Sequence, residues 1–427
     1  MRPPILKRLL SRVAATAALG LLAATLSATT AAQPAAAAAG LQQVTGFGSN
    51  PGNLQMYAYT PAGLPANAPL VVALHGCTQT ANAYYTNSGW PKYADQWGFA
   101  VVFPQTTSAN NALSCFGWFD PNEDTRGKGE AASIVQMVDY AKKTYGSDGR
   151  RVYVTGLSAG GGMTADLLAA YPDVFAGGSV ASGLPAQCAT SQAAASGCQT
   201  GPQKLTPAQW GDKVRAAYPG YKGPWPKVAI WQGTSDYTVY PANATALRDQ
   251  WTNVWGISQT PSSTDSLPGS TTRTVYNDAS GKPAVEMYSV SGMGHGLPVG
   301  PGSGAQQCGS TAAYFLSTLC STYYTGVFWG LDGGTEPGDP GDPGDPGDPG
   351  DPGDPGDPGD PGDPDPAQCY TATNYAHVTA GRAHMSGGYV YANGSDQNMG
   401  LYNVFVSHTL KETPAGYFVI ADSGCTA

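Results

Sequence analysis

The sequence has few basic residues: 21 Lys and Arg stand against 30 Asp and Glu in 427 residues, and the net charge is −9. One segment, residues 336–366, holds eleven of the acidic residues and no basic one. Without that segment and the four basic residues of the first twelve, the rest of the chain has a net charge of −2. Nucleic-acid-binding domains need clustered Lys and Arg, so we expect no nucleic-acid partner.

The spacings of a metal site are also lacking. No Cys-x2-Cys pair occurs, and the five histidines do not cluster with cysteines. Structural zinc sites depend on such spacings. We therefore expect neither a metal ion nor an organic cofactor.

Only one long apolar run is present, at residues 13–26. It follows four basic residues and precedes a stretch of small residues that ends near position 39. This arrangement is typical of a secretory signal peptide and too short for a membrane anchor. We expect residues 1–39 to be a signal peptide, and the mature protein to be secreted, monomeric and not bound to a membrane.

Eight cysteines, all after the predicted signal peptide, fit an oxidising compartment. Their number is even, but sequence alone does not determine the connectivity. If sequence neighbours pair, the disulfides are Cys77–Cys115, Cys188–Cys198, Cys308–Cys320 and Cys369–Cys425.

Residues 338–364 are nine tandem Gly-Asp-Pro triplets. Glycine at every third position is also the collagen pattern, but an Asp in each triplet would stack like charges in a triple helix. We favour an extended, self-repelling linker, which at about 3.1 Å per residue would reach roughly 80–90 Å. The linker, at 336–366, would separate a large domain at 40–335 from a small, β-rich, disulfide-closed domain at 367–427.

Within the large domain, apolar runs typical of buried strands alternate with stretches of helical spacing. This alternation indicates an α/β domain with a mainly parallel sheet. We expect strands at 54–59, 70–74, 99–103, 152–154, 177–181, 227–232 and 284–290, and helices at 130–145, 163–170, 243–255 and 311–319.

The segment 152–163 contains Gly-x-Ser-x-Gly between a predicted strand and a predicted helix. In that context the motif indicates a nucleophile elbow. A serine on a sharp strand-to-helix turn crowds its neighbours, so Gly156 and Gly160 must be almost free of side chain. The alternative, a glycine-rich loop capped by a serine, does not need the flanking strand and helix. We predict Ser158 as the catalytic nucleophile.

A serine nucleophile needs a base and a group that orients the base. Asp236 follows one predicted strand, and His295 follows another, between two glycines that suggest a mobile, uncrowded loop. The order Ser158, Asp236, His295 is that of α/β-hydrolases. Many loop aspartates only cap turns, but Asp212 and Asp249 are placed less well than Asp236. We predict these three residues as a catalytic triad in an α/β-hydrolase domain.

A tetrahedral intermediate also needs two hydrogen-bond donors for its oxyanion. We predict the N–H of Ala159, directly after the nucleophile, as one of them. The other is expected from the turn after the strand at 70–74, and we choose the N–H of Cys77. For His75, in the same turn, we favour a packing or hydrogen-bonding role over acid–base chemistry.

These residues resemble the secreted polyhydroxyalkanoate (PHB) depolymerases. The similarity implies a serine esterase that hydrolyses poly(3-hydroxybutyrate) or related short-chain polyesters through an acyl-enzyme. The motifs are Leu-His-Gly-Cys-Thr-Gln at 74–79, Gly-Trp-Phe-Asp at 117–120, Gly-Leu-Ser-Ala-Gly-Gly-Gly-Met at 156–163 and Gly-Met-Gly-His-Gly at 292–296.

The small domain is similar to the polymer-adsorbing domains of these enzymes, at 374–377, 380–384 and 398–402. The resemblance implies that it binds the surface of an insoluble polyester. Most of its aromatic residues are expected in its core. The residues expected to contact the polymer are His377, Arg382, His384 and Tyr402.

Two other functions stay open. The catalytic motifs are shared with feruloyl and acetylxylan esterases, in which case the small domain would bind glycan. A non-catalytic adhesin with a vestigial hydrolase domain is the second, and the complete triad disfavours it.

Overall fold

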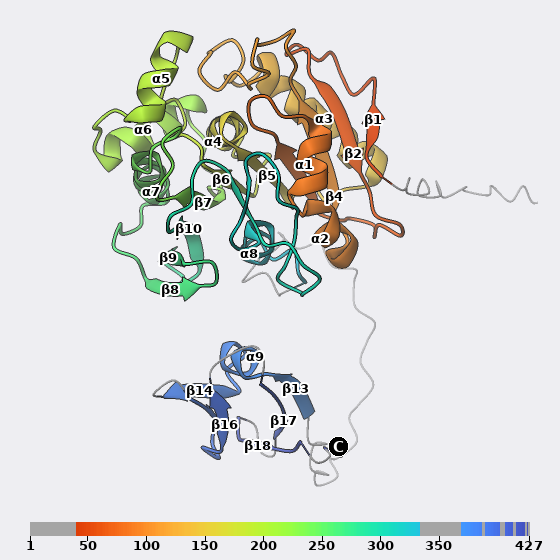
Figure 1. Cartoon of the computed structure of the whole chain (residues 1–427), viewed down its shortest axis with the longest axis vertical. Coiled ribbons are helices and arrows are strands. Elements are labelled where there is room, and N and C mark those ends of the chain that lie inside the picture. Colours follow the sequence, from red (N-terminus) through yellow and green to blue (C-terminus); the bar gives the residue numbers. More distant parts are fainter. Residues whose placement is uncertain are drawn as a thin grey trace, which may run out of the picture. The chain divides into compact units, whose positions relative to one another are not determined.

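The computed structural model describes residues 40–333, 369–386, 389–401, 406–412, 416–422 and 425. The predicted signal peptide, the linker and Tyr402 lie outside the described residues. The chain forms two compact units that divide after Asp342 (Figure 1). The boundaries at 335 and 367 stay predictions.

A ten-stranded sheet forms the centre of the large unit. Its strands are β1 (Gln42–Val44), β2 (Gln55–Tyr59), β3 (Leu70–Leu74), β4 (Ala100–Gln105), β5 (Val152–Leu157), β6 (Gly177–Ala181), β7 (Lys227–Gly233), β8 (Ser263–Leu267), β9 (Thr271–Asn277) and β10 (Pro283–Val290). Their spatial order is β1-β2-β4-β3-β5-β6-β7-β10-β9-β8. The strands from β4 to β10 in this order run parallel, and antiparallel strands flank them. The predicted mainly parallel sheet is confirmed.

Helices cover both faces of this sheet (Figure 1). They are α1 (Ala81–Asn87), α2 (Trp90–Trp97), α3 (Gly129–Tyr145), α4 (Ala159–Ala170), α5 (Gln192–Thr200), α6 (Pro207–Ala217), α7 (Ala242–Trp255) and α8 (Ser321–Phe328). Successive strand residues point to opposite faces, so Leu70 and Val72 share a core with α3, α4, α6 and α7. Val71 and Ala73 share the second core with α1 and α2. Burial on both faces explains the continuous apolar runs of the central strands.

The helix predicted at 311–319 is wrong. That segment instead contains the short strand β12 (Phe315–Ser317), which pairs in parallel with β11 (Leu297–Val299). A nine-residue helix would rise about 13 Å, whereas the Cys308–Cys320 disulfide holds its two Cα atoms 5.3 Å apart. The disulfide therefore closes the segment into a loop.

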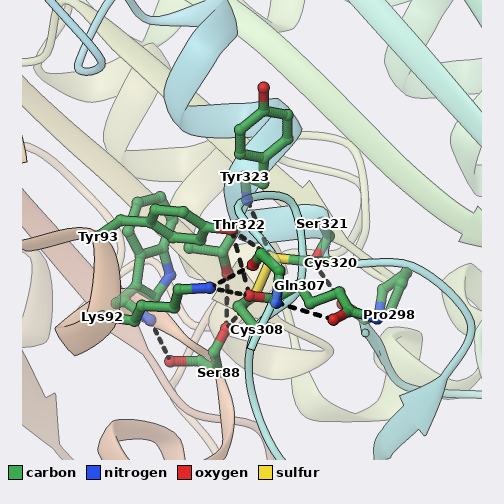
Figure 2. Close-up of a disulfide and its surroundings, with 12 residues drawn as sticks. Ser88, Lys92, Tyr93, Pro298, Gln307, Cys308, Cys320, Ser321, Thr322 and Tyr323 are labelled. Carbon is green, nitrogen blue, oxygen red and sulfur yellow. Dashed lines mark hydrogen bonds between the residues drawn. A yellow bond between two sulfur atoms is a disulfide. The ribbon is translucent and has the colours of Figure 1, made fainter. Parts of the chain in front are cut away.

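Figure 2 shows how the base of this loop is attached to the rest of the unit. Lys92 of α2 donates to the carbonyl of Gln307. The Thr322 hydroxyl donates to the carbonyl of Ser88 at 2.6 Å, beside the start of the same helix. Both cysteines of the disulfide are buried. The 308–320 loop is thus anchored at both ends to α2 and its surroundings.

All four disulfides between sequence neighbours are present, which confirms the predicted pairing. Such a set is typical of proteins that mature in an oxidising compartment. Among the described residues, no helix combines the length and apolarity needed to cross a bilayer.

The small unit is rich in β-structure, as predicted. Its elements are β13 (Cys369–Thr373), α9 (Asn374–Thr379), β14 (Ala383–Ser386), β15 (Tyr389–Ala392), β16 (Asn398–Leu401), β17 (Ser407–Glu412) and β18 (Phe418–Ile420). They form two three-stranded sheets, β13-β17-β18 and β14-β15-β16. A compact core that includes Val390, Leu410 and Phe418 holds them together, and the Cys369–Cys425 disulfide closes the unit.

Glu130, in the first turn of α3, makes the stability of the large unit depend on pH. It is buried, and its Oε2 accepts a hydrogen bond from the Gly117 N–H at 2.7 Å. Burial raises the pKa of Glu130 from 4.5 to about 7. The folded state therefore keeps a proton that the unfolded state has released, so the free energy of unfolding should fall as pH rises through this range.

Glu130→Gln should flatten that part of the stability profile, because the amide does not titrate. Urea unfolding between pH 4.5 and about 7 measures the effect. Asp139→Asn, at an exposed position on the same helix, is the matched control. A profile for Glu130→Gln as steep as that of the wild type would contradict this prediction.

Candidate active site

Ser158 lies on the turn between β5 and α4, where the sequence places the nucleophile elbow. Its φ of 58° and ψ of −117° are strained for a residue with a side chain. A Cβ on Gly156 would lie 2.2 Å from the carbonyl oxygen of Gly160. A Cβ on Gly160 would lie 2.5 Å from the carbonyl oxygens of Leu74 and His75. Both glycines are therefore required by close backbone approach, as predicted.

Asp236 is fully buried in the turn after β7. Its Oδ2 contacts His295 Nδ1 at 2.8 Å and accepts from Gln232 Nε2 at 3.2 Å. Its Oδ1 accepts from the N–H groups of Thr238 and Val239, both at 2.9 Å. Burial pushes the pKa of Asp236 upward, but the hydrogen bond and charge of His295 and the two amides outweigh it and lower the pKa. The carboxylate is thus held ionised and fixed in orientation.

The loop of His295 is attached to its neighbours more firmly than the flanking glycines suggest. The Ser235 N–H, beside Asp236, donates to the Met293 carbonyl at 3.0 Å. The Ser182 hydroxyl donates to the Gly296 carbonyl at 3.2 Å. A Cβ on Gly296 would meet the Tyr314 carbonyl oxygen at 2.8 Å. The prediction of an uncrowded loop is therefore wrong at Gly296, where the glycine permits close packing.

The bond to Asp236 leaves Nε2 of His295 available to Ser158. Ser158 is itself nearly buried at the elbow, with 9% of its surface exposed. In the described residues, Ser158 Oγ and the His295 ring are not joined by a hydrogen bond. Such contacts are often long in unliganded enzymes and tighten when substrate binds. The structure thus pairs two of the three predicted triad residues and presents the third on its elbow.

The turn after β3, residues 75–79, carries the predicted oxyanion donor Cys77, and we call it the oxyanion turn. Gly76 N–H donates to Gln79 Oε1 at 2.7 Å, Thr78 N–H to the Leu113 carbonyl at 2.7 Å, and Gln79 N–H to the Gly76 carbonyl at 3.2 Å. Among the N–H groups of residues 76–79, only that of Cys77 has no acceptor within the described residues. A Cβ on Gly76 would lie 3.5 Å from Ser158 Cβ, so this turn adjoins the nucleophile.

Ala159 is the first residue of α4. The first N–H groups of a helix have no acceptor within it, and the positive end of the helix dipole lies at the same place. The predicted oxyanion donor Ala159 thus directly follows Ser158, and the other, Cys77, lies in the turn that adjoins the nucleophile.

His75 is the first residue of the oxyanion turn and is fully buried. Its Nδ1 contacts the Gly76 carbonyl at 2.7 Å, and its ring packs on Phe116 with centroids 4.9 Å apart. Burial lowers the pKa of His75 to about 4. The ring is therefore neutral near neutral pH, in keeping with a packing role.

The predicted polymer-contact residues of the small unit lie in different settings. His377 is fully buried, and its Nε2 contacts the His408 carbonyl at 2.9 Å. Arg382 donates to His377 Nδ1 at 3.2 Å and lies over the Tyr370 ring. His384 is exposed and contacts Asn393 Oδ1 at 2.9 Å. This burial favours a structural role for His377 and leaves His384 as the accessible histidine.

Sequence reasoning missed Gln232, Ser182 and Gln79, which orient Asp236, the His295 loop and the oxyanion turn. Each is a single polar residue, and only Gln79 lies within a motif. Its place two residues after Cys77 was the one available signal.

Comparison with known proteins identifies relatives of the large unit. Residues 54–272 match the family model described as Esterase PHB depolymerase. Poly(3-hydroxyalkanoate) depolymerase C of Paucimonas lemoignei is 54% identical over 294 residues, which cover 69% of this chain and 70% of the relative. Feruloyl esterase B of Neurospora crassa is 40% identical over 267 residues, covering 61% of this chain and 89% of the relative.

Among solved structures, an acetyl xylan esterase from Aspergillus awamori aligns with a TM-score of 0.58 and 30% sequence identity. The alignment covers 68% of this chain and 99% of that structure. The large unit therefore has the α/β-hydrolase fold of an esterase.

Gly160→Ala tests the close packing at the elbow. Because the added methyl group would meet two backbone carbonyls at 2.5 Å, we expect a fall in melting temperature and a loss of ester hydrolysis. Gly197→Ala in α5 is the control, since a Cβ there meets nothing within 4 Å and alanine favours a helix by up to about 1 kcal/mol over glycine. An active, equally stable Gly160→Ala protein would contradict the close approach.

Asp236→Asn tests the orientation of His295. The amide would favour the wrong tautomer of the imidazole, and we expect kcat for ester hydrolysis to fall by up to about 10⁴-fold. Asp212→Asn, at an exposed ion pair on α6, is the matched control. A kcat within threefold or so of the wild type for Asp236→Asn would be incompatible with its role in the triad.

Proposed function

Because the chain belongs to the esterase PHB depolymerase family, we propose that it is an extracellular serine esterase that hydrolyses poly(3-hydroxybutyrate) or related short-chain polyhydroxyalkanoates. The observation that carries the proposal is the 54% identity over 294 residues to a poly(3-hydroxyalkanoate) depolymerase. The Asp236–His295 pair and the elbow at Ser158 supply the chemistry that such an enzyme needs.

In the proposed reaction, His295 Nε2 accepts the proton of Ser158 Oγ as the oxygen attacks an ester carbonyl. The N–H groups of Cys77 and Ala159 donate to the oxyanion of the tetrahedral intermediate. Collapse breaks the ester bond, and His295 returns the proton to the leaving alcohol. A water molecule, deprotonated by His295, then attacks the acyl carbon, and His295 returns this proton to Ser158 Oγ as the acid is released. Asp236 stays ionised throughout and stabilises the imidazolium.

The oxyanion donors are preorganised, which is how such sites lower a barrier. Loss of one donor typically costs about 3 kcal/mol of transition-state stabilisation. The hydrogen bonds of Gly76, Thr78 and Gln79 hold the turn while Cys77 N–H is left for the substrate. These hydrogen bonds therefore fix the backbone of the turn and leave the Cys77 N–H available to the substrate.

The small unit would adsorb the enzyme to the polymer. Met385, Tyr389 and Tyr417 are exposed by 54, 45 and 41%, and aromatic rings can contact a polymer that has ester carbonyls but no charge. His384 can donate to those carbonyls. A tethered module of this kind raises the local concentration of an insoluble substrate. We propose that the enzyme is secreted and acts as a monomer, without nucleic-acid or membrane partners.

Hydrolysis of feruloyl or acetyl groups from plant polysaccharide is the second candidate function. The 40% identity to a feruloyl esterase and the structural similarity to an acetyl xylan esterase favour it. In that case the small unit would bind glycan. The higher identity to the depolymerase places the polyester first.

Clearing of an opaque poly(3-hydroxybutyrate) suspension, compared with release of ferulate from arabinoxylan, distinguishes the two candidates. We expect clearing. Ser158→Ala should abolish it and keep adsorption, because only the attacking oxygen is lost, while Ser263→Ala, at an exposed serine of β8, should leave it unchanged. Faster release of ferulate than of hydroxybutyrate would overturn the polyester assignment.

A chain that ends at residue 335 should show the reverse behaviour. It should hydrolyse soluble esters normally but sediment less with polymer granules, since the proposed adsorbing unit is gone. Equal sedimentation of the shortened and full-length chains would contradict the role of the small unit.

A further inference from the structure

We propose that Leu113 and Tyr314 contact the polyester chain on the two sides of the catalytic serine, so that the large unit binds and orients the polymer independently of the small unit. This inference rests on the proposed function. It follows from the placement of two exposed apolar side chains, with 61% of Leu113 and 44% of Tyr314 accessible.

Tyr314 lies on the histidine side of the site. Its ring meets the His295 ring edge-on, with centroids 5.9 Å apart and planes at 75°. Leu113 lies on the oxyanion side, because its carbonyl accepts from Thr78, the neighbour of Cys77, at 2.7 Å. A chain whose ester carbonyl sits between His295 and the Cys77 amide must therefore pass near both residues.

Both side chains are held on constrained loops. The Cys77–Cys115 disulfide ties the Leu113 loop to the oxyanion turn, and the Cys308–Cys320 disulfide closes the loop that contains Tyr314 (Figure 2). Gln79 Nε2 donates to the Ala313 carbonyl at 3.4 Å, which also links this second loop to the oxyanion turn. Apolar groups that are fixed before binding lose little conformational entropy when they bind.

Tyr314 has a backbone conformation that a bulky residue adopts only under constraint, with a φ of 65°. The Leu297 N–H donates to its carbonyl at 2.8 Å, and the adjacent Phe315 is buried. The fold thus accepts strain at this position and exposes an aromatic ring beside the catalytic base. Strain of this kind concentrates at functional sites.

The surrounding sequence fits an uncharged ligand. Residues 104–119 and 287–331, which contain the two loops, have no Asp, Glu, Lys or Arg. A charged side chain at such an interface would lose its hydration without gaining a partner on a polyester. The chemistry therefore favours the alkyl groups and backbone of a polyester chain as the ligand.

The test compares kcat/KM for a soluble 3-hydroxybutyrate trimer with kcat/KM for p-nitrophenyl acetate, using the full-length protein. The acetate ester has only a methyl group on its acyl side and no hydroxybutyrate unit on either side, whereas the trimer extends past the reacting centre. Tyr314→Asn and Leu113→Ser should each lower the trimer-to-acetate ratio about tenfold. Asparagine tolerates a positive φ, so its variant should fold, and thermal melting checks this.

Tyr314→Phe keeps the ring and should keep the ratio. Val327→Ser removes an apolar side chain of 39% exposure on α8 and is the matched control. An unchanged ratio in Tyr314→Asn and Leu113→Ser, or an equal fall for both substrates, would overturn the proposed contact. A wild-type protein that cleaves p-nitrophenyl acetate but no hydroxybutyrate trimer would instead overturn the proposed function.

Discussion

The site depends on one close approach between backbones. Gly160 at the start of α4 lies against the carbonyls of Leu74 and His75 at the end of β3, at a distance that leaves no room for a side chain. This contact brings the elbow and the oxyanion turn together, although more than 80 residues separate them in the sequence. The strained φ of Ser158 and the two glycines around it are consequences of the same constraint.

The sequence predicts the centre of the fold well, because the physical causes there are local or periodic. Central strands such as β3 are buried on both faces, so their residues form continuous apolar runs that can be recognised directly. Each proposed triad residue follows one of these strands, and the carboxyl ends of parallel strands meet at one edge of a sheet. Their approach in space could therefore be expected before any coordinates.

The predictions that fail depend on contacts with distant residues. The segment 311–319 has local features compatible with a helix, but a disulfide and pairing with β11 make it a loop and a short strand. The resemblance implies that His377 contacts the polymer, but its side chain is fully buried in the small unit. Gln79 orients the oxyanion turn through a single side-chain bond, which no periodicity reveals.

An insoluble substrate requires both a high concentration of enzyme at its surface and an oriented chain in the site, and we propose that the two units meet these requirements separately. A tether can raise the concentration of enzyme at a surface, but a flexible connection does not orient a chain in the site. Orientation requires contacts that are rigid relative to the nucleophile. In the large unit, disulfides constrain the two loops that carry Leu113 and Tyr314, and residues 104–119 and 287–331 contain no Asp, Glu, Lys or Arg. We therefore expect specificity for an uncharged polymer to arise at these loops, whatever surface the small unit binds.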